Sequence, residues 1–184
     1  MIQSLTMGRV GALILLAGLG ALSAFGQTFA GTGTTTVSVT VGAEASLSIT
    51  TSATALATSG SLFSNYTGST DLAYKIRTTQ STGTGSIVLQ ITSDFNGTGG
   101  PKVASPPSPG DALTYNCSVA SSGTACSAGQ TASTTATTSV ATFGADAHSI
   151  KAGDTGAVSW TLTNDPAYKT GSYSATATFT ISAT

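Results

Sequence analysis

Charge is the scarcest property of this chain, since Asp, Glu, Lys and Arg make up 7% of its 184 residues against about 25% in an average soluble domain. The sequence shows no basic patch that would favour nucleic-acid binding and no polybasic or amphipathic helix that would indicate a lipid surface. Glu, Lys, Leu and Met, which favour helices, are also few outside the N-terminal stretch, and Thr, Ser, Ala and Gly predominate instead. Because threonine suits strands and Gly and Ser suit turns, the composition predicts an all-β protein.

The first 26 residues have the pattern of a secretory signal peptide. Arg9 supplies the positive region, residues 10–22 form an uncharged apolar run, and Ala24 and Gly26 are the small residues at a cleavage site. The apolar run is shorter than the roughly 20 residues of a membrane span, although an uncleaved anchor is the alternative. We therefore expect a secreted domain, residues 27–184, that lies outside the cell, on its surface or in the periplasm. Residues 27–184 contain five Lys and Arg and seven Asp and Glu, which gives this domain a net charge of −2.

Cysteine occurs only twice, at Cys117 and Cys126. In an oxidising compartment the two are expected to form a disulfide. A short turn centred on Ser121 and Ser122 would place them opposite each other across a hairpin, within disulfide reach. A redox pair or metal site is the alternative, but the spacing is not C-x-x-C and no histidine stands nearby.

Apolar and polar residues alternate along most of the chain after residue 33, which is typical of half-buried strands. The predicted strands cover residues 34–41, 47–49, 72–77, 87–92, 113–117, 140–143, 158–163 and 173–181. Strands 72–77 and 87–92 are expected to form a hairpin around residues 82–85, and Gly/Pro-rich loops separate the others. About eight short strands of this kind predict an Ig-like Greek-key β-sandwich of two sheets.

No motif in the sequence carries a complete catalytic or metal site. Asp154-Thr155-Gly156 matches the aspartic-protease triplet, but that chemistry needs two carboxylates, so a turn before the next strand explains it better. His148 is the single histidine and no G-x-S-x-G elbow accompanies it. Asp94 and Asn96 resemble part of a calcium loop whose other ligands are missing, although several loops together are an alternative calcium site. We expect no enzymatic activity, no cofactor and no metal.

Aromatic residues at or near the loops give an alternative function. Exposed rings stack on sugars, whereas buried rings fill the core or cap the ends of a sandwich. The candidates are Phe63, Tyr66, Phe95, Tyr168 and Tyr173, and the corresponding function is a secreted carbohydrate-binding module. Three sequons begin at Asn65, Asn96 and Asn116 and matter only in a host that glycosylates.

Both ends of the expected domain resemble a known group of proteins. Residues 34–41 (TTTVSVTV), followed by 45–49 (ASLSI), and the final stretch 171–182 (GSYSATATFTIS) are similar to the first and last strands of small exported bacterial β-sandwich subunits. These include spore-coat-U-like proteins and archaic chaperone–usher pilins. The chain departs from them at Ser46 and Ser48, where those families place a cysteine, and at Ala183-Thr184, where better-known pilins have a near-terminal aromatic.

The resemblance implies that an incomplete sandwich is finished by a strand from the next molecule. The candidate donor lies within residues 27–41, with Phe29, Thr35, Val37, Val39 and Val41 on one side. The alternative is that this segment is strand A of its own sandwich. The expected function is a secreted, non-enzymatic structural or adhesive protein of the cell surface or extracellular space. Its expected partners are further copies, other surface proteins or polysaccharide.

Overall fold

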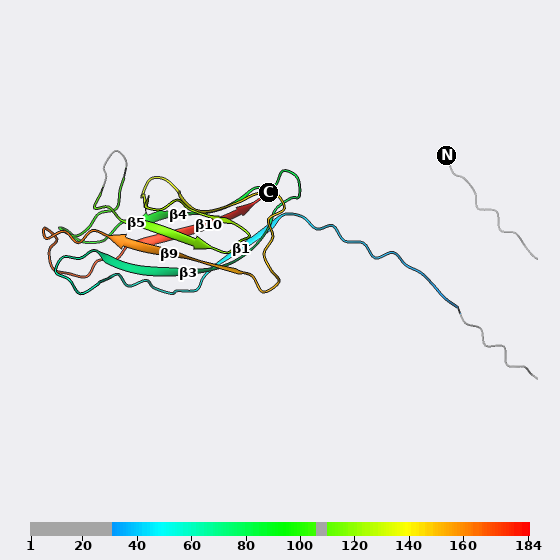
Figure 1. The fold of residues 1–184 in the computed structure, drawn as a ribbon, viewed down its shortest axis with the longest axis horizontal. Coiled ribbons are helices and arrows are strands. Elements are labelled where there is room, and N and C mark those ends of the chain that lie inside the picture. The colour runs from blue at the N-terminus through cyan, green and yellow to red at the C-terminus, as the bar shows by residue number, and fades with distance from the viewer. Residues whose placement is uncertain (1–30, 106–109) are drawn as a thin grey trace, which may run out of the picture. The chain divides into compact units, whose positions relative to one another are not determined.

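The computed structural model describes residues 31–105 and 110–184, which contain strands and no helix (Figure 1). The strands are β1 (Glu44–Ile49), β2 (Ala57–Thr58), β3 (Tyr66–Arg77), β4 (Gly85–Ser93), β5 (Thr114–Val119), β6 (Thr124–Ala125), β7 (Gln130–Thr131), β8 (Thr138–Phe143), β9 (Asp154–Leu162) and β10 (Thr176–Ala183). The all-β expectation is confirmed. The predicted signal peptide and Phe29 lie outside the described residues. The chain divides after Val39, and all the strands belong to the unit Thr40–Thr184.

The strands form two antiparallel sheets that pack face to face. One has the order β1-β3-β9-β5-β7, with β2 also paired to β3, and the other has the order β10-β4-β8-β6. In immunoglobulin constant domains, strands A, B, E and D form one sheet and C, F and G the other. Here β1, β3, β9 and β5 take the places of A, B, E and D, and β4 and β10 take those of C and F. The expected Ig-like sandwich is therefore confirmed, but no strand among the described residues takes the place of G beside β10.

The core follows from the two-residue period of the strands, because every second side chain points between the sheets. In β4, Ile87 and Leu89 are 0% exposed. The other buried side chains in the centre of the sandwich come mainly from β3, β5, β8 and β9: Leu72, Tyr74, Ile76, Tyr115, Val140, Val158, Trp160 and Leu162. The polar atoms of the buried Trp160 and Tyr115 side chains are hydrogen-bonded. Trp160 Nε1 donates to Thr70 Oγ1 at 2.8 Å, and Tyr115 Oη donates to Ser139 O at 2.8 Å.

The expectations for residues 34–41, for the connection 82–85 and for the turn at Asp154 are wrong. Residues 34–41 are exposed and belong to no strand, since the first strand begins at Glu44. Strands β3 and β4 lie in different sheets, so residues 82–85 connect the sheets and close no hairpin. Asp154 is the first residue of β9, and the turn lies just before it at Gly153, which has a φ of 97°. The alternation of apolar and polar residues indicates where a strand can form, but it contains no information on which strands pair.

The predicted disulfide is present, with Cys117 and Cys126 5.5 Å apart between Cα atoms. The hairpin that was expected to hold this disulfide is absent, because β5 belongs to one sheet and β6 pairs with β8 in the other. Cys117 lies in β5, and Cys126 directly follows β6. The bond therefore joins the two sheets along one side of the sandwich.

Replacing both cysteines by serine should lower the free energy of unfolding by about 2–3 kcal/mol, since the disulfide closes a loop of about ten residues. Urea unfolding of the oxidised protein and of the double variant measures the difference. An unchanged midpoint and slope would contradict a stabilising role for this link between the sheets.

Candidate functional site

The most unusual feature of the sandwich is the side opposite its disulfide. Strands β1 and β10 each have one paired neighbour within the described part of the chain, so they are the edges of their sheets. They contact each other across the two layers. Each edge presents backbone N–H and C=O groups that no strand of the described residues pairs. We call this side the open edge.

Apolar side chains at the open edge are only partly covered. The inward-facing residues of β10 are half-buried: Ala177, Phe179, Ile181 and Ala183. Leu47 of β1 is half-buried, and Ile49 at the end of β1 is 40% exposed. By contrast, Ile87 and Leu89 of β4, which lie opposite Ile181 and Phe179 of β10, are 0% exposed. The core pattern thus continues to β1 and β10, but nothing in the described residues covers it there.

A groove with a volume of about 1090 Å³ opens at this place. Its floor includes side chains from both sheets, among them Ile91 of β4, Trp160 of β9 and Phe179 of β10. It is lined mostly by residues 51–56 and 164–175, at one end of the sandwich. The groove therefore combines a strip of strand edge with a pocket between loops.

All five aromatic residues predicted from the sequence line this groove: Phe63, Tyr66, Phe95, Tyr168 and Tyr173. They do not form one exposed row. Phe63 is 62% exposed, whereas Phe95 is 8% exposed and belongs to the core. The Tyr173 hydroxyl donates to Lys169 O at 2.8 Å. The Tyr168 hydroxyl is buried without a hydrogen-bond partner among the described residues.

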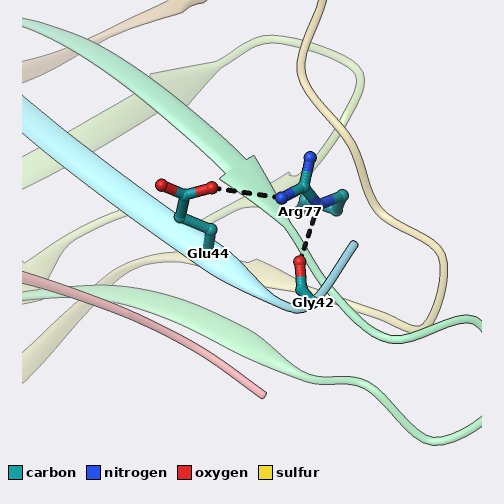
Figure 2. A network of polar contacts seen from close by, with 3 residues as sticks. All are labelled: Gly42, Glu44 and Arg77. Carbon is teal, nitrogen blue, oxygen red and sulfur yellow. Dashed lines mark hydrogen bonds and ion pairs between the residues drawn. The ribbon is translucent and has the colours of Figure 1, made fainter. Parts of the chain in front are cut away.

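At the other end of the sandwich an arginine holds the start of β1 (Figure 2). Arg77 Nε donates to Gly42 O at 2.7 Å, and Arg77 Nη2 lies 3.1 Å from Glu44 Oε2. Arg77 and Glu44 are also directly paired in the ladder of β1 and β3. Arg77 was not predictable as a contact residue, because an outward-facing arginine in an alternating strand has no distinctive signal in the sequence.

The residues of the catalytic and calcium motifs found in the sequence do not come together. Asp154 accepts a hydrogen bond from Ser122 Oγ at 2.5 Å, and His148 Nδ1 lies 2.8 Å from Asp146 O in an exposed loop. Asp94 Oδ1 accepts from its own loop at Phe95 N and Val103 N. Within residues 31–105 and 110–184, no three His, Cys, Asp or Glu side chains are grouped as a metal site would need.

No helix in the described part of the chain has the length and hydropathy to cross a membrane. Comparison with protein-family models, with curated proteins and with solved structures finds no match for this chain. The geometry of the open edge is therefore the basis for a functional assignment.

Above about pH 10, the free energy of unfolding should fall because of the buried Tyr168 hydroxyl in the groove. Burial raises the pKa of Tyr168 to about 12, and the carboxylates of Asp111 and Asp165 add to the rise. The folded state therefore keeps a proton that the unfolded chain loses near pH 10. The stability from this proton is complete below that pH and is lost as the pH rises toward 12. Urea unfolding at about pH 8 and about pH 11 should show a smaller loss for Tyr168→Phe than for the parent. Equal losses would contradict this source of alkaline sensitivity.

Proposed function

We propose that this protein is a secreted, non-enzymatic structural or adhesive subunit that associates with further copies by strand exchange. Residues 34–41 of one copy enter the open edge of another and take the vacant place beside β10. The observation that carries the proposal is that the described chain has both halves of such a contact. It has a sheet edge without a neighbour and a strand-like segment without a sheet.

The backbone supports this pairing. The segment 34–41 and β10 are both eight residues long, so one strand would satisfy the free edge of β10 over its whole length. Addition of a strand to a sheet edge derives its affinity from main-chain hydrogen bonds and its specificity from alternate side chains. Neither the segment nor β10 contains proline or a charged residue, so no backbone N–H is missing from either strand and no charge would be buried.

The side chains support it as well. Val37 and Val39 are 91% and 84% exposed, and Val41 is 62% exposed. The three valines and Thr35 share one face of an extended strand, and that face would cover the half-buried side chains of β10. Full burial of a valine contributes about 1.5 kcal/mol or more. The other face carries Thr36, Ser38 and Thr40 and matches the hydroxyl-rich outer surface of β10.

Export is part of the proposal. The Cys117–Cys126 disulfide fits an oxidising compartment, and residues 1–26 have the signal-peptide pattern. The exported group of subunits that the two ends resemble assembles by strand addition, which agrees with the open edge. A surface built from Ser, Thr, Ala and Gly, with few charges to titrate, suits a durable external protein.

Aspartate at both Val37 and Val39 should make the protein monomeric, because two carboxylates would have to be buried in the groove. The matched control places the same two charges on the outer face, as Thr36→Asp with Ser38→Asp, and should still associate. Light scattering after size-exclusion chromatography of residues 27–184 measures both. Equal association of the two variants, or a monomeric parent at all concentrations, would contradict strand exchange.

Convergence of the five aromatic residues on one groove favours a second function, that of a carbohydrate-binding module. In that case Tyr173→Ala should abolish retention on polysaccharide beads, whereas the double aspartate variant should bind as well as the parent. Absence of retention by the parent on a broad polysaccharide panel would exclude this second function.

A further inference from the structure

We infer that a basic pocket, at the end of the sandwich remote from the aromatic residues of the groove, binds an acidic polysaccharide. This pocket has a volume of about 270 Å³ and is lined by residues 44–46 of β1, 75–77 of β3 and 148–151 of the loop before β9. None of these residues lines the groove at the open edge. The inference therefore does not depend on strand exchange and concerns what an adhesive surface of this protein would hold.

The pocket concentrates the few positive charges of the protein. Residues 27–184 contain five Lys and Arg, and three of them line the basic pocket: Lys75, Arg77 and Lys151. The single histidine, His148, lines it as well, and Glu44 is the one acidic residue among the lining residues. The rest of residues 27–184 is left with two basic and six acidic side chains. A chain with a negative net charge thus has one distinctly positive surface, which favours an anionic ligand.

Backbone hydrogen bonds hold the loop side of the pocket against β3. Arg77 and His148 form an isolated antiparallel bridge. Ser149 N donates to Ile76 O at 2.9 Å, and Ile76 N donates to Ser149 Oγ at 3.1 Å. Residues that are more than 70 positions apart in the sequence are therefore fixed side by side, and the pocket is formed before any ligand binds.

Two lysines of the pocket are available to a ligand. Gly153 leaves room for the Lys75 side chain, because a Cβ at this glycine would lie 3.3 Å from Lys75 Cγ and Cε. Lys151 belongs to the turn that Gly153 N closes by donating to Ile150 O at 2.9 Å. Both lysines are exposed, and neither ammonium has an ion-pair partner within residues 31–105 and 110–184. An anionic group can therefore contact them without displacing a carboxylate of the protein.

Arg77 contributes charge to the pocket but no complete fork of donors. Its Nε donates to Gly42 O at 2.7 Å and its Nη2 lies 3.1 Å from Glu44 Oε2 (Figure 2). A carboxylate or phosphate that is held bidentately needs two parallel N–H groups, and two of the three guanidinium nitrogens are already engaged. The lysine ammonium groups are point charges on flexible stems. The pocket is therefore suited to anionic groups that repeat along a polymer, more than to a single tightly held anion.

The uncharged part of the pocket fits a sugar polymer. Ser46, which lies directly opposite Lys75, and Ser149 present hydroxyl groups, and hydroxyls both donate to and accept from the hydroxyls of a sugar. Ile150 is 67% exposed and offers an apolar surface to the C–H face of a sugar ring. Recognition of anionic lipid headgroups typically uses clusters of about four to eight Lys and Arg, whereas this pocket has three, one of them already paired. A polysaccharide with carboxylate or phosphate groups is therefore the ligand class that this surface favours.

Retention of residues 27–184 on polygalacturonate and phosphomannan beads tests the inference, with methyl-esterified polygalacturonate and mannan as the neutral counterparts. The parent should be retained on an acidic polymer and on neither neutral one, and about 1 M salt should release it. The acidic polymer that retains it identifies the anionic group as carboxylate or phosphate. Lys75→Gln with Lys151→Gln should weaken the affinity about tenfold, as expected for two exposed charge pairs. Lys102→Gln with Lys169→Gln removes the same charge elsewhere and should bind as the parent. Glu44→Gln removes the acidic lining residue and should strengthen binding about two- to threefold.

Absence of parent retention on both acidic polymers, or equal binding by the two double lysine variants, would show that the inference is wrong. Loss of binding in Tyr173→Ala would assign the polysaccharide to the groove at the open edge and would also overturn it. Sedimentation with vesicles of equimolar phosphatidylcholine and phosphatidylserine, without retention on either acidic polymer, would assign the pocket to a lipid surface instead. Strand exchange is measured separately by light scattering, so failure of the basic pocket would leave the proposed function standing.

Discussion

A sandwich buries an inward side chain only where the opposite sheet and the neighbouring strand both cover it. In this protein that condition holds for β3, β4 and β9 and is not met at β1 and β10. The alternation of β10 nevertheless continues unchanged to Ala183, with Phe179 and Ile181 on its inner face. The strand therefore carries the sequence of a central strand at the position of an edge. The proposed strand exchange depends on this mismatch.

The two sides of the sandwich differ in how their edge strands are covered or linked. On one side, the short strands β6 and β7 end the sheets, and the disulfide from Cys117 to Cys126 ties one sheet to the other. On the other side no covalent link exists among the described residues, and the groove reaches into the core as far as Trp160. The sandwich thus has one side that is closed covalently and one side whose edge strands have no further neighbour among the described residues.

The sequence predicted what depends on local periodicity and missed what depends on pairing. Strands at Leu72–Ile76 and Ile87–Ile91 were predictable because their apolar residues alternate, and the disulfide was predictable from compartment and count. Sheet membership of β5 and β6 was not, since a short turn favours a hairpin as readily as a crossing between layers. The segment 34–41 also alternates, with Val37, Val39 and Val41 on one face, yet it belongs to no strand among the described residues, because alternation does not specify a partner strand. The aromatic residues were found as a set, but whether each is core or surface depends on the loops that place it.

Edge strands of soluble proteins are usually defended against pairing by lysine, proline, inward charges or bulges. Strand β10 has none of the first three, and its single irregularity lies at its start, between Thr176 and Ala177. An undefended eight-residue edge with an apolar inner face would be an aggregation hazard unless pairing were its purpose. On β1, by contrast, Glu44 at the start of the strand forms an ion pair with Arg77 of the neighbouring β3, next to the link from the segment 34–41. The two edge strands thus differ, because β1 starts with a charged pair whereas β10 carries no charge or proline that would oppose a further strand.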